Sequence, residues 1–251
     1  MKNWLSKVLL ALLSPLVAIA LLEGLLRLFD VGYPTAFLRE AVVDGRTCWV
    51  NNSFYGYRFF DPRIARNPAP IRILKDKPDG LIRIAVLGES AAMGDPAIEF
   101  SLARGLEKML NPPGAPRRFE VVNAAMTAIN SPVIVDIAAD MARCGADIFV
   151  VYMGNNEVVG PYGPGTAITA GDWGLALTPW RVALTRLRLA GVLRGLARAA
   201  DGHAEDPLAW TGMEMFKQNR IPQDDPRLAP MYRQFEDNID RILAIARVAK
   251  I

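Results

Sequence analysis

The chain has 251 residues, 51% of them hydrophobic, and a formal net charge of +3. That length accommodates one sizeable α/β domain together with a membrane anchor. So small a charge, with no stripe of Lys and Arg interleaved with aromatic residues, excludes nucleic acid as an expected partner.

The first segment, residues 1–29, predicts a cytoplasmic N-terminus followed by a transmembrane anchor. Residues 8–29 are almost wholly apolar, and Lys2 and Lys7 precede them. About 20 apolar residues are enough to cross a bilayer, and leading lysines favour a cytoplasmic N-terminus. Glu23 and Arg27 stand four residues apart, so we expect them to pair near the outer boundary. The segment predicts a single-pass inner-membrane protein whose main domain lies in the periplasm.

A cleaved signal peptide is the alternative, because Ala18-Ile19-Ala20 resembles a peptidase site. The apolar run continues through Leu25 and Leu26, which favours a retained anchor. A buried core helix fits less well, since the segment is terminal and follows lysines.

Residues 30–80 contain many Pro, Arg and aromatic residues with little periodicity. We expect them to wrap over the domain as extended segments. Cys48 and Cys144 are the only cysteines. Export would permit a disulfide, but Cys144 precedes a core strand and Cys48 precedes the domain, so two unpaired thiols are expected.

Residues 81–251 predict the main domain, with β-type runs at 82–87, 119–123 and 147–153. The first, rich in Val, Ile and Leu, is typical of a central parallel strand covered on both faces. Small and amide residues follow each run. Polar groups at successive strand ends can converge on one place, as an acyl-transfer site requires.

Ser90 follows the first run, within Gly88-Glu89-Ser90-Ala91-Ala92-Met93-Gly94. Its hydroxyl should lie on the turn that leaves the strand, where it could act as a nucleophile. A serine here could instead cap the helix expected over residues 96–110, because a Ser hydroxyl accepts from free backbone N–H groups. This run alone leaves both interpretations open.

Two blocks of the chain resemble the SGNH (GDSL) hydrolases. The family's first block, Gly-Asp-Ser-x-x-x-Gly, is matched by Gly88, Ser90 and Gly94, and its third, Gly-x-Asn-Asp, by Gly154 and Asn156. Residues 58–62 and 151–161 further resemble a membrane-anchored bacterial subgroup in which tetratricopeptide repeats often follow.

The resemblance implies a doubly wound, mainly parallel α/β sheet in a three-layer, flavodoxin-like sandwich. It implies an acyl-enzyme on Ser90, with oxyanion donors from the N–H groups of Ser90 and Ala128 and the side chain of Asn156. Ala128 stands where the second block normally has glycine, and would be strained if the site needs a positive φ. Asn155 is expected to serve the turn instead.

Other departures concern the carboxylates and the base. Glu89 and Glu157 stand where the family has Asp, and the family's Asp-x-x-His block is absent. The only histidine, His203, lies in a polar stretch with Asp201 one residue too close. We therefore expect the chain to be the front part of a longer protein, with the base and any repeats beyond Ile251, and residues 1–251 to have at most trace esterase activity.

Three features complete the chain. Residues 160–174 form a Gly- and Pro-rich loop suited to a substrate entrance. Arginines recur through residues 180–200, as a solvated helix face or as a contact for a membrane surface or an anionic polymer. Residues 226–250 predict an amphipathic helix, with apolar residues at helical spacing.

The combination predicts an envelope-facing serine ester hydrolase acting on an acylated glycan or lipid, with O-acetyl esters as one possibility. An O-acyltransferase of an exported polysaccharide uses the same acyl-enzyme, and a non-catalytic binding or assembly module is the third hypothesis. No Cys/His cluster has metal spacing and no phosphate-binding glycine motif occurs, so neither a metal nor another cofactor is expected.

Overall fold

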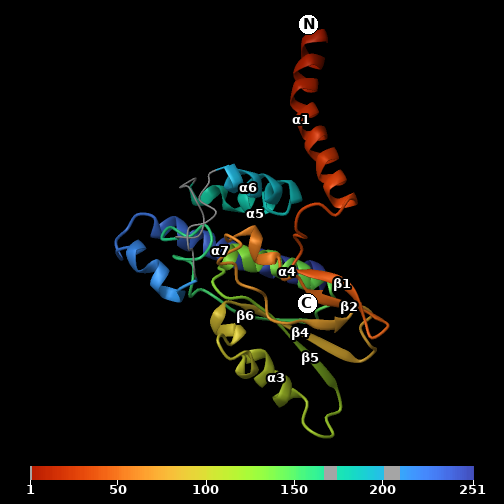
Figure 1. Ribbon diagram of the computed structural model, residues 1–251. Coiled ribbons are helices and arrows are strands. Elements are labelled where there is room, and N and C mark those ends of the chain that lie inside the picture. The colour runs from red at the N-terminus through yellow and green to blue at the C-terminus, as the bar shows by residue number, and fades with distance from the viewer. Residues whose placement is uncertain (1, 167–173, 201–209) are drawn as a thin grey trace.

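The computed structural model describes residues 2–166, 174–200 and 210–251. A long helix projects from a mixed α/β body (Figure 1). In chain order the helices and strands are α1 (Lys2–Leu28), β1 (Leu38–Val43), β2 (Arg46–Asn51), β3 (Arg72–Leu74), β4 (Leu81–Gly88), α2 (Ser90–Met93), α3 (Leu102–Leu110), β5 (Arg118–Ala125), α4 (Ser131–Arg143), β6 (Ile148–Tyr152), α5 (Thr178–Leu184), α6 (Arg188–Ala200) and α7 (Leu228–Ala249). Short 3-10 turns join several of them.

The three predicted strands are confirmed as β4, β5 and β6, which form one parallel sheet in the order β5-β4-β6. The central strand β4 pairs over its whole length with β5 and over its second half with β6. Parallel pairing brings the carboxyl ends of all three strands to one edge of the sheet. Because β5 and β6 lie on opposite sides of β4, the connection after β4 runs to one side and the connection after β5 runs to the other, and ligands bind at such a point in α/β sheets.

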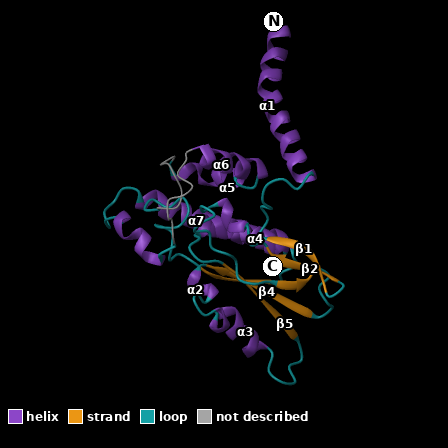
Figure 2. Ribbon diagram, in the orientation of Figure 1, coloured by secondary structure: helices purple, strands orange, loops and turns teal. Residues whose placement is uncertain are grey.

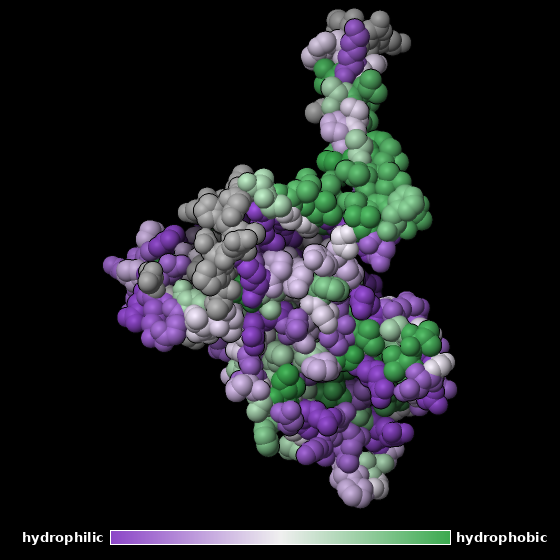
Figure 3. All heavy atoms as spheres, viewed as in Figure 1, coloured by the Kyte–Doolittle hydropathy of each residue, from purple (hydrophilic) through white to green (hydrophobic). Residues whose placement is uncertain are grey.

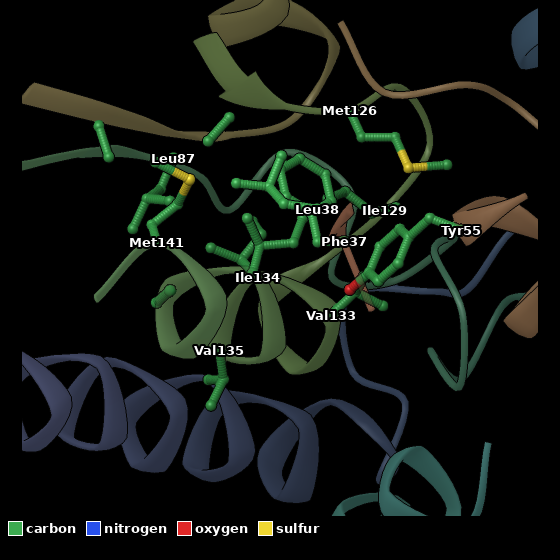
Figure 4. Packing of buried hydrophobic residues seen from close by; sticks show 14 of the residues in the cluster. Phe37, Leu38, Tyr55, Leu87, Met126, Ile129, Val133, Ile134, Val135 and Met141 are labelled. Atoms are coloured by element: carbon green, nitrogen blue, oxygen red, sulfur yellow. The ribbon is translucent and has the colours of Figure 1, made fainter. Parts of the chain in front are cut away.

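Helices cover both faces of this sheet (Figure 2). Successive side chains of a strand point to opposite faces. Leu87 packs with Ile134 and Met141 of α4 on one face (Figure 4), while Val86 packs with Ala103 of α3 on the other. Helix α7 lies outside α4. The body is therefore a mixed α/β protein with a parallel three-stranded sheet between helical layers.

Residues 30–80 do wrap over the body, but they also contain a sheet that the sequence did not predict. Strands β1, β2 and β3 pair antiparallel in that order. The following aromatic residues Tyr55, Phe59 and Phe60 are buried in the same core as α4. This segment is thus an integral part of the body's core.

The apolar N-terminal segment forms one unbroken helix, α1, which runs through residues 18–20. Among the described residues, it is the one helix long and apolar enough to cross a membrane, over Ser6–Leu28 with mean hydropathy 2.4. The expected Glu23–Arg27 pair is present at 2.7 Å.

The arginines of residues 180–200 are partly exposed but paired with other segments of the protein, which the interpretation as a simple solvated face did not include. Arg186 pairs with Asp136, Arg188 with Asp30, and Arg198 with Asp61. Arg194 donates to the carbonyl of Arg58 at 2.7 Å. These contacts tie α6 and the turn before it to the rest of the protein, while the side chains of Arg186 and Arg198 keep 43% and 38% of their surface exposed.

Two smaller predictions are confirmed and one is corrected. Cys48 and Cys144 are free, buried thiols, and α7 matches the expected C-terminal helix. The helix expected over residues 96–110 begins only at Leu102, where Ser101 Oγ accepts from the N–H of Arg104 at 3.3 Å. Residues before it form a 3-10 turn, Ile98–Phe100.

Candidate functional site

A cavity of about 260 Å³ lies at the carboxyl edge of the parallel sheet. Ser90 follows β4, Ala128 follows β5, and Asn156 follows β6, and all three line this cavity. The remaining lining residues are Asp95, Pro96, Thr127, Val159, Trp210 and Gly212. The structure therefore brings together the predicted nucleophile and both other predicted oxyanion donors.

Ser90 is the first residue of α2, and Glu89, which precedes it, is the N-cap without a side-chain capping bond. The interpretation of Ser90 as a capping serine is therefore wrong. Helix α3 takes its cap from Ser101 instead. Within the described residues, neither the Ser90 hydroxyl nor its backbone N–H makes a hydrogen bond, so both remain able to meet a ligand.

Gly88 and Gly94 flank Ser90 at positions that admit no larger residue. A Cβ at Gly88 would lie 2.1 Å from the carbonyl oxygen of Tyr152. Gly94 has φ +84°, and a Cβ there would lie 2.8 Å from the Cα of Ser101. These close approaches let the turn carrying Ser90 fold tightly against β6 and the start of α3.

Ala128 adopts the left-handed conformation, with φ +64°. An L-residue with a Cβ is disfavoured there by about 1–2 kcal/mol. The site does require a positive φ at residue 128, so the backbone of Ala128 is strained. Its N–H makes no hydrogen bond within the described residues. Strained backbone of this kind concentrates at functional sites.

Asn156 and Asn155 occupy different environments. Asn156 is buried, and its side-chain Nδ2 donates to the carbonyl of Ile129 at 3.0 Å. That bond uses one amide hydrogen and orients the group, and the second hydrogen remains for a ligand. Asn155 is exposed and does not line the cavity.

Glu89 ties the Ser90 turn to the turn after β6. It is fully buried, and its Oε1 accepts from the N–H of Gly154 at 3.1 Å. Burial raises the pKa of the Glu89 carboxyl to about 7; the Gly154 N–H opposes that shift, and nearby Glu157 adds to it. Gly154, with φ +120°, lets its N–H turn toward this carboxylate.

Glu157 makes a second tie, between the end of β6 and the start of α4. Its two carboxylate oxygens accept from the backbone N–H and the hydroxyl of Ser131, at 2.8 and 2.7 Å. Asn238 of α7 donates to the same hydroxyl at 3.0 Å. Burial raises the pKa of Glu157 as well. Glu89 and Glu157 thus fix the turns after β4 and β6 and the start of α4 relative to one another, behind the cavity.

Sequence reasoning missed a polar group in the cavity wall. Asp95 Oδ2 accepts from the hydroxyl of Thr127 at 2.7 Å and lies 3.6 Å from a guanidinium nitrogen of Arg66. The same guanidinium lies over the ring of Trp210, 5.3 Å from its centroid. Asp95 follows Gly94 of the Ser90 block directly in the sequence. That position next to the block was the signal from which its place in the cavity wall could have been predicted.

His203 and the second half of the 160–174 loop fall in residues 201–209 and 167–173, outside the described part of the chain. Comparison with family models, with curated proteins and with solved structures found no match for this chain.

Proposed function

We propose that this protein is a serine-dependent esterase of SGNH type that acts on short O-acyl esters through an acyl-enzyme on Ser90. One observation carries the proposal: a single cavity contains an unbonded serine hydroxyl, a strained turn with a free N–H, and a buried, oriented amide. Each comes from the end of a different parallel strand, where α/β sheets place their ligands.

The reaction begins with attack of Ser90 Oγ on the ester carbonyl carbon. The carbonyl oxygen becomes an oxyanion, stabilised by the N–H groups of Ser90 and Ala128 and by Asn156 Nδ2. Collapse expels the alcohol and leaves an acyl group on Ser90. Water then attacks that ester, and the serine and a carboxylic acid are released.

A base must take the proton of the Ser90 hydroxyl, because serine is a weak nucleophile at its free pKa. Among the described residues, Asp95 is the carboxylate that lines the cavity. The SGNH resemblance calls instead for a histidine: His203 is the only one in residues 1–251, and the expected Asp-x-x-His block beyond Ile251 is the other source. Exchange of each residue separates these two sources.

The size of the cavity favours a short acyl group. A volume of about 260 Å³ lies below the 300–1,000 Å³ of most drug-sized ligand sites. An acetyl ester, with its alcohol portion outside the cavity, fits this space. The substrate class is therefore an O-acetylated glycan or a similar small ester.

The test is whether a covalent acyl-enzyme forms on Ser90. Purified full chain is mixed with 4-nitrophenyl acetate, quenched in acid and digested, and the peptides are analysed for an added acetyl group. We expect acetyl on the Ser90 peptide, formed slowly because residues 1–251 should have at most trace esterase activity, and none after Ser90→Ala. Asp95→Asn and His203→Ala identify the base, since its loss slows acylation by about 10²–10⁴-fold.

An unacetylated Ser90 peptide and equal release of 4-nitrophenol by the parent and Ser90→Ala would overturn the esterase proposal in favour of a binding module. Turnover that rises when a sugar acceptor is added, with the acetyl group recovered on the sugar, would identify an acyltransferase.

We further propose that α1 is a retained inner-membrane anchor and that the site faces the periplasm. The apolar helix, the Lys7 that precedes its apolar run, and the unbroken helix through residues 18–20 support this. The protein should stay with membranes after an alkaline carbonate wash, and protease added outside the inner membrane should digest the body. A soluble form beginning at Leu21 would show a cleaved signal peptide.

A further inference from the structure

Helix α6 has its polarity reversed relative to an ordinary surface helix. Its charged residues Arg194 and Arg198 turn toward the body, on the Arg58 carbonyl and on Asp61. Leu193 and Leu196 turn outward and are 56% and 62% exposed. A helix on a water-facing surface places these two classes the other way round.

The neighbouring helix α5 also presents large apolar side chains outward. Val182 is buried against the body, while Trp180 and Leu184, on the opposite side of that helix, are exposed. Arg181 lies over the ring of Tyr162, 4.5 Å from its centroid. An exposed Trp beside leucines is typical of a surface at the boundary between water and lipid.

The outer end of α1 fixes the position of α6. Glu23 accepts from the backbone N–H groups of Arg188 and Leu189 at 3.0 Å each, so a carboxylate of α1 caps the start of α6. Arg27 donates to the Arg186 carbonyl at 3.0 Å, and Arg188 pairs with Asp30 at 2.8 Å. These contacts join the two helices directly.

This junction lies at the level of a bilayer surface if α1 spans the membrane. Lys7 and Arg27 are about 20 residues apart, which is about 30 Å along a helix and equals the hydrocarbon thickness of a bilayer. Arg27 contacts Arg186 just before the start of α6, and α6 runs crosswise to α1 (Figure 1). The apolar surface of the lower part of α1 continues toward it (Figure 3).

We propose that the outward face of α6, with α5 beside it, rests in the interface of the same bilayer that α1 crosses. This extends the proposed anchor: α1 holds the protein in the membrane, and α6 fixes how the body sits on it. The contact is apolar, because the arginines are paired with the body. It should therefore form on uncharged phosphatidylcholine and persist at high salt.

The test uses the full chain in phosphatidylcholine nanodiscs, with single nitroxide labels at Leu196→Cys, Leu16→Cys and Met109→Cys. Leu16 lies in the middle of α1, and Met109 of α3 is the matched control because it is apolar and 79% exposed. The native thiols are buried, and the unsubstituted chain measures their labelling. Power saturation compares access of oxygen, which dissolves in lipid, with access of a water-soluble nickel complex.

We expect the ratio of oxygen to nickel access at Leu196 to be several-fold above that at Met109 and to be unchanged at high salt. A ratio equal to that at Met109, with Leu16 in lipid, would overturn the proposal and leave the anchor intact. A water-accessible Leu16 would overturn both. Neither result bears on esterase activity, which is measured separately.

A second variant controls for the possibility that the nitroxide label itself partitions into lipid. Leu196→Glu, with the label moved to Leu193→Cys, introduces a charge without removing any buried contact of the body. If the face rests on lipid, the carboxylate should raise nickel access at residue 193 several-fold. No change in nickel access would contradict the proposed contact.

Discussion

The cavity at the sheet edge and the α5–α6 layer both reverse the usual placement of polar and apolar groups. Around the cavity, the carboxylates of Glu89 and Glu157 are buried behind a strained backbone. On α6, leucines are exposed and arginines turn inward. Most surfaces avoid both patterns, because burying charge and exposing large apolar side chains are unfavourable. The comparison indicates that each region meets something other than bulk water.

The largest expected effect is on the free energy of unfolding, through the ion pairs that attach α5, α6 and the turn between them to the body. Asp136 is buried and pairs with Arg58 and Arg186. Asp136→Asn leaves the Arg58 guanidinium buried without its counter-ion, which should lower the free energy of unfolding by about 3–5 kcal/mol. Urea unfolding in detergent micelles measures this change.

The control for that prediction is Asp44→Asn. Asp44 pairs with Arg72 at 3.3 Å on the exposed surface, where a pair contributes about 0–1 kcal/mol. Equal losses from the two variants would show that burial of the Asp136 cluster does not govern its contribution.

Next in size is the oxyanion donor in the cavity. In a protein extended through the expected downstream Asp-x-x-His block, Asn156→Ala should lower kcat by about 10²–10³-fold, or about 2.7–4 kcal/mol, with little change in KM, because the bond forms mainly in the transition state. Asn155→Ala is the matched control, since Asn155 is exposed. A larger loss from Asn155→Ala would mean that the third block is placed one residue out.

Glu89 should make stability depend on pH. The folded protein keeps the Glu89 proton until its pKa of about 7, whereas the unfolded chain releases it near 4.5. Between these values the folded state binds more protons, so stability falls as pH rises, by about 3 kcal/mol in total.

Thermal unfolding from pH 4 to pH 8 tests this sign. Glu89→Gln should remove most of the decline, with the remainder due to Glu157 and Asp140, whose pKa values burial also raises. Glu40→Gln, at a half-exposed position paired with Lys75, should leave the decline as in the parent chain. Stability that rises through this window would contradict the assigned burial effect.

The smallest expected effect is relief of strain at Ala128. Glycine adopts φ +64° without a Cβ clash, so Ala128→Gly should raise stability by about 1 kcal/mol. The backbone N–H is retained, and ester turnover should persist. Ala124→Gly, in the buried strand β5, should lower stability by about 1 kcal/mol instead. Destabilisation by both exchanges would show that Ala128 is not strained.

The sequence by itself predicted the elements that local patterns specify. Short β-type runs marked β4, β5 and β6, helical spacing marked α7, and an apolar run behind lysines marked α1. It also placed Ser90, Ala128 and Asn156 at three strand ends. These predictions succeed because periodicity and strand ends follow from the backbone geometry of a few neighbouring residues.

Only the tertiary structure decided the rest. The pairing of β3 with β2 joins residues 22 to 26 positions apart, and no local period specifies that partner. The β1–β2 pair differs, because it is a hairpin around Asp44-Gly45, a two-residue turn with a local sequence signal. The direction of Arg194 and Arg198 depends on the Arg58 carbonyl and on Asp61, contributed by a distant segment. The left-handed φ of Ala128 is imposed by surrounding contacts, since alanine alone disfavours it. These features require groups far apart in the sequence to meet, so they are fixed only when the chain packs.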